Sequence, residues 1–420
     1  MKLYYIPKEE LDKITDLDVL TDALRLNILY MVQQAGSGHL GGSLSSLDIM
    51  IDLFYRKMKP EDIFISSKGH DAPALYAVLQ AKGIIPFDSI HSFRRPGGLP
   101  GHPTIDVPGI LFNTGSLGMG ISKANGLAKA DKIKGINRNI YVLIGDGEAQ
   151  EGQIFESLWH QEDNVHIYLD YNGFQLSRET ALHTYFANNK RIKVIISTKG
   201  HGINFMEGNN KYHAGALSNE DYNNAVAELR DSLPDVRVIK TDKIPYQRPE
   251  KPHQLASHYP YILDEVGMNE KVVVLDADLE PDCGLILFKE KNPDRFIECG
   301  IREQDMVSMA TGFSQGGFIP IVHSFAAFLC RRANEQIYNA CLERRHIVFV
   351  GHFAGLLPVG AGTSHECLED IALMKTMPNM TVLVPETGEQ LRSAILWAVN
   401  EATNPVYVSI RCWGIEGMRR

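Results

Sequence analysis

The sequence predicts an α/β protein built from two doubly wound domains with parallel sheets. Short apolar runs rich in β-branched residues alternate with longer helical patterns along most of the 420 residues. This alternation is typical of parallel sheets that carry helices on both faces. The length exceeds what one hydrophobic core usually serves. A stretch with four prolines and mixed charge follows the first half, so we expect domains at 1–231 and 257–420 and a linker at 232–256.

Strand and helix candidates follow from these patterns. The clearest strands of the first domain are Asn139–Ile144, Val165–Asp170 and Arg191–Ser197. Those of the second are Lys271–Leu275, Arg295–Cys299, Ile319–His323, His346–Val350, Met380–Val384 and Val406–Ile410. Helices are expected between the latter strands at Gln304–Gln315, Phe328–Arg344, Cys367–Met374 and Gly388–Ala402. Doubly wound folds bind ligands at the carboxyl ends of their strands, so function is expected in the loops there.

Composition excludes several classes of protein. Hydrophobic residues make up 44% and charged residues 22%, as in ordinary globular proteins. The net charge of −9 argues against a general nucleic-acid binder. The six cysteines form no C-x-x-C pair, the N-terminus lacks the apolar core of a signal peptide, and no apolar run could span a membrane. We therefore expect a cytoplasmic protein that binds neither nucleic acid nor membrane.

Two polar turns follow successive predicted strands of the first domain. Gly145-Asp146-Gly147 comes after one strand, and Asn172-Gly173-Phe174 after the next. Each alone is more often a simple turn. Together they offer a carboxylate, an amide oxygen and a carbonyl, which are the hard-oxygen ligands that Mg²⁺ prefers. The pairing favours a metal site.

Five of the 15 histidines lie in loops rich in glycine and other small residues. A single histidine of this kind is usually structural or solvated. Five on separate loops suggest an active site, because imidazole donates or accepts a proton near neutral pH. They are His39, His70, His102, His213 and His365.

These motifs resemble the transketolase family. GDGEAQEGQ followed by DYNGFQ is similar to its thiamine diphosphate signature, and SGHLGGSLSSLDI, SSKGHDAPALYAVL, GLPGHPTIDVPGI, NTGSLGMGIS and GIREQDM resemble further family segments in order. The resemblance runs from about Asp22 to Arg411 and implies two domains of the thiamine diphosphate-binding fold. The stretch between the first two motifs is about one helical turn shorter than usual.

The resemblance implies roles for residues around the cofactor. Asp146, Asn172 and the Phe174 carbonyl would bind Mg²⁺, for which Ca²⁺ or Mn²⁺ could substitute, and Gly147 would face the diphosphate. The implied neighbours of the thiazolium and diphosphate are Gly115, Ser116 and Leu117.

Further implied roles lie at the other ring of the cofactor. Glu303 would exchange a proton with the aminopyrimidine ring, and Phe325 and Phe328 would stack on that ring, although an acidic helix start and core phenylalanines are common for other reasons. Glu151 and Glu156 would link paired sites by shared protons, with a solvated helix face as the alternative. The two rings are generally held by different subunits in this family, so a homodimer is expected.

The histidines would contact substrate. His39, His70, His102 and His213 would line the cleft of the diphosphate domain, and His365 would come from the second domain. In this scheme His102, His365 and His39 steady the oxygens of the transferred fragment, and His70 or His213 moves protons to the acceptor.

Several family positions differ here. The phosphate-binding arginine and serine fall at Ala256 and Asp282, and an aspartate repels a phosphate dianion. Loop 357–365 lacks the aspartate that reads donor hydroxyls, and Arg331 replaces an aromatic residue. The family's third domain has no counterpart in the sequence, so a partner protein could supply it.

The expected function is transfer of a two-carbon ketol unit from a ketose to an aldehyde acceptor, on a specialised sugar rather than ordinary pentose phosphates. One alternative is pyruvate decarboxylation with acetaldehyde transfer, as in deoxyxylulose-phosphate synthases. The other is a catalytically silent subunit that needs a partner.

Overall fold

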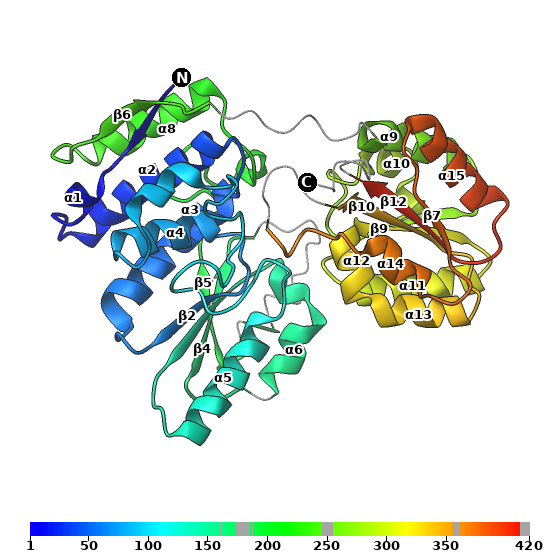
Figure 1. Cartoon of the computed structure of the whole chain (residues 1–420), viewed down its shortest axis with the longest axis horizontal. Helices are drawn as coiled ribbons and strands as arrows, with labels where there is room; N and C mark the ends of the chain where they lie inside the picture. Colours follow the sequence, from blue (N-terminus) through cyan, green and yellow to red (C-terminus); the bar gives the residue numbers. More distant parts are fainter. Residues whose placement is uncertain (160, 174–184, 187, 246–254, 356–361, 412–420) are drawn as a thin grey trace. The chain divides into compact units, whose positions relative to one another are not determined.

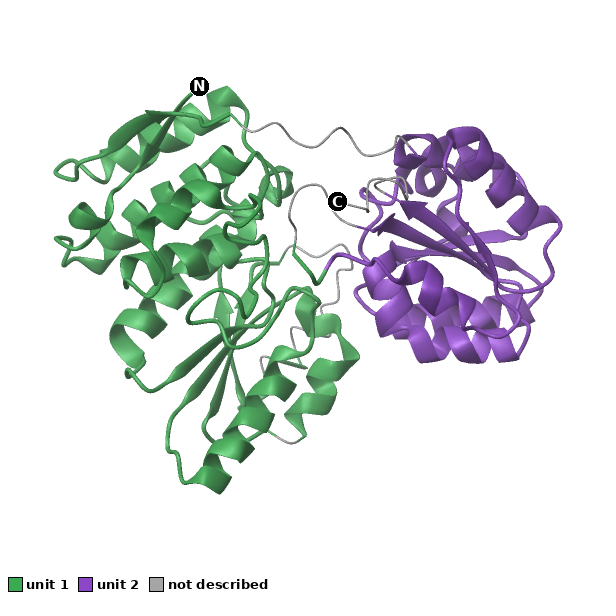
Figure 2. Cartoon of the chain, in the orientation of Figure 1, with its two compact units in different colours: residues 1–175, 179–247, 359–364 green, residues 176–178, 248–358, 365–420 purple. Residues whose placement is uncertain are grey.

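The computed structural model describes residues 1–159, 161–173, 185–186, 188–245, 255–355 and 362–411. The chain divides into two compact units, coloured separately in Figure 2. Unit 1 comprises residues 1–175, 179–247 and 359–364, and unit 2 comprises 176–178, 248–358 and 365–420.

Unit 1 is built around a four-stranded parallel sheet in the order β2-β3-β4-β5 (Figure 1). Its strands are β2 (Ile63–Ser66), β3 (Ile140–Gly145), β4 (Val165–Tyr171) and β5 (Ile192–Ile196). The helices of this unit are α1 (Lys8–Leu11), α2 (Leu17–Ala35), α3 (Leu40–Asp52), α4 (Ala72–Ala81), α5 (Gly120–Lys134), α6 (Gly152–Leu158) and α8 (Asn219–Asp231).

Both faces of this sheet are covered, which explains the unbroken apolar sequence of β3. Ile140, Val142 and Ile144 join one core cluster with residues of α5 and α6. Tyr141 and Leu143 point to the opposite face and join a second cluster with α2, α3 and α4. Alternate residues of a strand face opposite ways, so a strand buried on both faces must be apolar throughout.

A separate two-stranded antiparallel sheet joins the two ends of unit 1. It pairs β1 (Lys2–Tyr5) with β6 (Ile239–Asp242). β6 lies within 232–256, for which the sequence predicts a linker, so the structure differs there: the first part of this stretch belongs to unit 1. Residues 246–254 lie outside the described part of the chain.

Unit 2 has a six-stranded parallel sheet in the order β11-β12-β10-β9-β7-β8. Its strands are β7 (Val272–Asp276), β8 (Phe296–Glu298), β9 (Ile319–Phe325), β10 (Val348–Ala354), β11 (Thr381–Leu383) and β12 (Val406–Arg411). Its helices are α9 (Leu255–Val266), α10 (Ile286–Lys291), α11 (Glu303–Gln315), α12 (Ala326–Arg332), α13 (Asn334–Leu342), α14 (Asp370–Lys375) and α15 (Gly388–Asn400).

The strand order of unit 2 reverses at β7, since β8 lies on one side of β7 and β9 on the other. Such a switch point is where doubly wound folds bind ligands. The predicted helix Phe328–Arg344 is two helices, α12 and α13, that meet at Ala333. The α/β class with parallel sheets is confirmed, and every predicted strand is present although several ends differ. None of the described helices has an apolar stretch that could cross a lipid bilayer.

Asp170 at the end of β4 ties several elements of unit 1 together. Its buried carboxylate accepts hydrogen bonds from Ser45 Oγ (2.8 Å) and Ser46 Oγ (3.0 Å) on α3 and from Lys68 Nζ (2.6 Å) after β2. Ser197 after β5 donates to its other oxygen. Burial would raise the pKa of Asp170, but the Lys68 charge and these donors outweigh it and lower the pKa.

We predict that Lys68→Met lowers the free energy of unfolding by about 3–5 kcal/mol, because it leaves a buried carboxylate without its cation. Urea denaturation at pH 7 measures this. Lys57→Met, which removes a partly exposed ion pair with Asp52, should cost no more than about 1 kcal/mol. An equal loss in both variants would contradict the prediction.

The difference in unfolding free energy between wild type and Lys68→Met should also depend on pH. The pKa of Asp170 is lowered in the folded protein, so its contribution to stability is present above its unfolded pKa and is lost as the pH falls. The difference between wild type and Lys68→Met should therefore shrink as the pH falls below about 4.

Candidate functional site

The two polar turns meet at the carboxyl end of the unit 1 sheet. β3 and β4 are parallel neighbours, with Gly145 opposite Asp170. Asp146 Oδ2 accepts a hydrogen bond from the Gly173 N–H (2.8 Å), and Oδ1 accepts one from the Gly147 N–H (3.0 Å). The predicted meeting of these turns is therefore confirmed. Asn172 immediately precedes Gly173, and Phe174 lies outside the described residues.

The surroundings of Asp146 suit a cation. Its side chain is buried, and burial together with the charge of Asp170 raises its pKa. Lys68 is already paired with Asp170. A divalent cation at Asp146 would offset the cost of keeping this carboxyl ionised. A carboxylate beside an amide oxygen fits Mg²⁺ chemistry.

A buried glutamate, Glu148, holds the glycine-rich loop 115–118 beside the turn that contains Asp146. Glu148 accepts hydrogen bonds from the Gly118 N–H (2.9 Å) and the Gly145 N–H (3.3 Å), and Ser67 Oγ also donates to it. Burial raises the pKa of Glu148 to about 7, against the opposing effect of these donors. Glu148 was not among the residues predicted from the sequence, where its only signal is its place directly after Gly-Asp-Gly.

Loop 115–118 passes close to His102. Gly115 has φ +101°, and a Cβ atom added there would lie 2.7 Å from the His102 ring. Ser116 and Leu117 follow in the same turn and are half-buried. The backbone at Gly115 can therefore approach the imidazole in a way that other residues could not.

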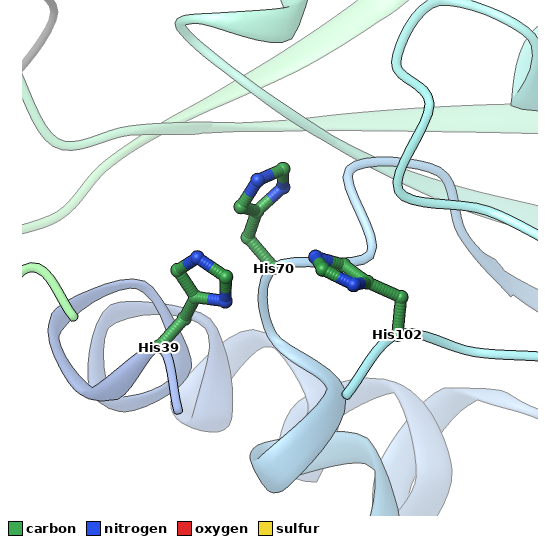
Figure 3. Close-up of side chains that lie close together, drawn as sticks. All are labelled: His39, His70 and His102. Carbon is green, nitrogen blue, oxygen red and sulfur yellow. The ribbon is translucent and has the colours of Figure 1, made fainter. Parts of the chain in front are cut away.

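Four of the five predicted histidines come together in unit 1. Figure 3 shows His39 at the start of α3, His70 before α4 and His102 with their rings grouped. The ring centroid of His39 lies 4.5 Å from that of His70, 5.3 Å from that of His102 and 5.6 Å from that of His213. The sequence predicted these residues as a group, and the fold places them together.

Burial favours the uncharged form of His39 and His70. It is the main cause that lowers the pKa of His70 to about 4, whereas the side chain of His213 is exposed. Burial and the neighbouring rings lower the pKa of His39 well below its usual value. His70 Nδ1 lies 2.7 Å from the Lys68 carbonyl oxygen. A carbonyl only accepts, so Nδ1 carries the proton and Nε2 has the lone pair.

Glu303 lies in unit 2 as the first residue of α11, and it is buried. Arg332 at the end of α12 donates through Nη1 to both carboxylate oxygens, at 2.8 Å and 2.7 Å. The Arg332 guanidinium also lies over the Phe328 ring, 5.0 Å from its centroid. Arg332 was not predicted, because its distance from Glu303 along the chain gives no sign of contact.

The predicted phenylalanine pair is stacked. The Phe325 and Phe328 centroids are 5.7 Å apart with an angle of 16° between the rings. His365 lies edge-on to Phe328 at 5.1 Å, and Phe353 lies edge-on to Phe325 at 4.8 Å. Arg331 pairs with Glu369 instead of joining the rings. Phe353 thus adds an aromatic ring that the sequence did not predict here.

The two remaining acidic candidates differ in exposure. Glu151 is buried, and a Cβ added at Gly118 would lie 2.9 Å from the Glu151 Cβ. Glu156 on α6 is exposed.

Two sequence models of known families match the chain. The model for the transketolase pyrimidine-binding domain matches residues 262–411, and the model for 1-deoxy-D-xylulose-5-phosphate synthase matches residues 8–258.

Individual proteins also match. Human transketolase is 28% identical, with 95% of this chain and 74% of the relative covered. One of the subunits of an apulose-4-phosphate transketolase from Phocaeicola vulgatus is 33% identical over 53% of this chain and 96% of the relative. The crystal structure of transketolase from Campylobacter jejuni aligns with a TM-score of 0.45 at 23% identity, over 96% of this chain and 80% of that one. From the sequence matches, the chain belongs to the transketolase family of thiamine diphosphate-dependent transferases.

Proposed function

We propose that this chain transfers a two-carbon ketol unit from a ketose donor to an aldose acceptor, with thiamine diphosphate and Mg²⁺ as cofactors. The observation that carries the proposal is the cluster of four histidines beside Gly115. Neutral imidazoles both donate and accept hydrogen bonds, which suits the hydroxyl and carbonyl oxygens of a sugar.

The residues at the end of the unit 1 sheet would hold the charged part of the cofactor. Asp146 and Asn172, with the Phe174 carbonyl, would bind the metal, and Gly147 would face the diphosphate. Gly115 and the two residues after it would pass beside the thiazolium. When bound, thiamine diphosphate supplies the nucleophilic carbon and the electron sink.

The histidines would act on the substrate. His39 Nδ1 has no hydrogen-bond partner within the described residues, and a sugar oxygen would supply one. His102 and His365 would hold further oxygens of the transferred fragment. His70 would accept a proton at Nε2, because its Nδ1 donates to the Lys68 carbonyl. His213 is the other candidate for this transfer.

Glu303 would exchange a proton with a ring nitrogen of the aminopyrimidine. Arg332 holds the carboxylate at both oxygens, which fixes its direction. Phe325 and Phe328 would pack against the same ring through an offset aromatic contact.

Two positions support a specialised sugar substrate, because they correspond to phosphate-binding residues of the family. Ala256 on α9 and Asp282 are both exposed in unit 2. Neither offers a positive charge or a neutral donor to a phosphate group.

The assembly and location are also inferred. A homodimer follows from the family's use of two subunits per cofactor, with Glu151 and Glu156 as proposed links between paired sites. A cytoplasmic location is supported by five buried free cysteines in the described residues, since reducing compartments keep thiols unpaired.

Two other functions have some support. The match of residues 8–258 to the deoxyxylulose-phosphate synthase model favours acetaldehyde transfer from pyruvate. Release of carbon dioxide from pyruvate would establish it. One relative is named as a subunit, which favours a chain that works only with a partner protein.

We predict that Glu303→Gln slows exchange of the cofactor C2 proton for deuterium by at least about a hundredfold, as expected for loss of a proton-transfer group. NMR of quenched samples measures the rate. Glu335→Gln changes an exposed carboxylate on α13 and should leave the rate unchanged. Wild-type protein that does not accelerate exchange would favour the silent subunit.

We predict that Asp146→Asn weakens Mg²⁺-dependent binding of thiamine diphosphate by at least about tenfold, since a neutral amide is a poorer metal ligand than a carboxylate. Titration calorimetry at fixed cofactor concentration measures this. The exposed Asp163→Asn is the control. Equal affinities in the two variants would remove Asp146 from the metal site.

We predict that wild-type protein is a poor catalyst with xylulose 5-phosphate and ribose 5-phosphate. Asp282→Ser should raise kcat/KM for the phosphorylated donor several-fold, because a charge repulsion worth about 1 kcal/mol in water is removed. Steady-state kinetics test both statements. Wild-type rates typical of transketolases would contradict the specialised substrate.

A further inference from the structure

Arg94 lies next to the histidine cluster and has no acidic partner among the described residues. Its Nη1 lies 3.5 Å from Ser37 Oγ, two residues before His39. Its Nε is buried and has no hydrogen-bond partner in the part of the chain that the structure describes. Burial lowers the pKa of Arg94 to about 10, and the Tyr76 phenol opposes this effect. The side chain as a whole is half-buried, and a guanidinium that is partly removed from water gains from an anionic partner, because desolvation is costly otherwise.

The backbone at Arg94 and at Gly101 accommodates the Arg94 side chain. Arg94 has φ +53°, in the left-handed region that residues with a Cβ rarely adopt. A Cβ added at Gly101 would lie 2.6 Å from Arg94 Nε and 2.9 Å from Cζ. Gly101 directly precedes His102, so the residue that makes room for the guanidinium also leads into the cluster.

A second cation adds to the positive potential. Lys199 is buried and donates to Asn210 Oδ1 at 3.2 Å. The charges of Arg94 and Lys199 both act on His70. The protein as a whole carries a net charge of −9. Arg94 and Lys199 therefore form a region of positive charge on a protein that is negatively charged overall.

We propose that Arg94 forms a subsite in unit 1 that binds an anionic group, a phosphate or a carboxylate, on the sugar substrate. The guanidinium offers its charge and its outer N–H groups to such a group, and an anion there would offset the cost of partly burying Arg94. The inference rests on the proposed function, since it places this anion on a sugar held by the histidines. It also gives the substrate a charged contact on unit 1. The positions Ala256 and Asp282 of unit 2 provide no such contact.

The test uses the holoenzyme saturated with thiamine diphosphate and Mg²⁺, so that the diphosphate site is filled. Titration calorimetry with inorganic phosphate and, separately, with acetate measures the affinity for each kind of anion. Wild type should bind at least one of them, and Arg94→Gln should bind it about tenfold more weakly, as expected for a lost charge-assisted hydrogen bond. Arg94→Lys should be intermediate, because it keeps the charge without the planar group of donors.

Two controls separate the subsite from a structural role. Arg56→Gln removes one exposed positive charge and should not change the affinity. Arg25→Gln breaks the ion pairs of a buried arginine with Asp22 and Asp48 and should lower the thermal unfolding midpoint of the apoprotein. Arg94→Gln should leave that midpoint unchanged or raise it, since a partly buried charge without an acidic partner among the described residues is removed.

Equal affinity in wild type and Arg94→Gln, or no binding of either anion by wild type, would overturn the subsite. A midpoint for Arg94→Gln as low as that of Arg25→Gln would overturn it in favour of a structural role. Exchange of the cofactor C2 proton, measured on the same samples, shows separately whether the proposed function holds.

Discussion

The Lys68–Asp170 ion pair is the interaction on which the unit 1 site depends. It joins the ends of β2 and β4, while serines of α3 and Ser197 after β5 complete the coordination of the carboxylate. The strands and helix that carry the loops of the site are therefore held at one point. Because Lys68 neutralises Asp170, the second carboxylate at this edge, Asp146, is left as the one without a cationic partner in the described contacts. A divalent cation would balance that charge.

Burial then sets the chemistry of the histidines. Imidazoles so close together and partly removed from water cannot all be charged, and nearby cations strengthen this effect. Neutral imidazoles can hydrogen-bond a polyol or bind a metal cation, and the ring nitrogens of His39, His70 and His102 lie within 4.8 Å of one another. Positive charge from Arg94 and Lys199 would repel a cation and attract an anion.

The sequence was sufficient to predict what is contiguous along the chain. The parallel sheets follow from apolar runs that alternate with helical patterns, and the meeting of Asp146 with Gly173 follows from turns placed after strands. The grouping of the histidines follows from their loops of small residues and from the family resemblance. What could not be predicted depends on contacts between distant residues. Glu148 and Arg332 act through hydrogen bonds that no local spacing reveals, and Phe353 reaches the phenylalanine pair only because β9 and β10 are neighbours. The sequence predicts a linker where β6 lies, because nothing local shows that its partner is β1 at the opposite end of unit 1 in sequence.

The pairing of Glu303 with Arg332 imposes a constraint on proton transfer. The role proposed for Glu303, exchange of a proton with a ring nitrogen, would need a carboxylate oxygen with a lone pair open to that ring. The geometry leaves such a lone pair. Both oxygens accept from the same nitrogen, Nη1, so each keeps a lone pair that does not face Arg332. One oxygen could therefore face a ring nitrogen of the proposed cofactor while the other retains the arginine. Because Arg332 also lies over Phe328, the same side chain orients the acid and one of the rings beside which the aminopyrimidine is proposed to pack.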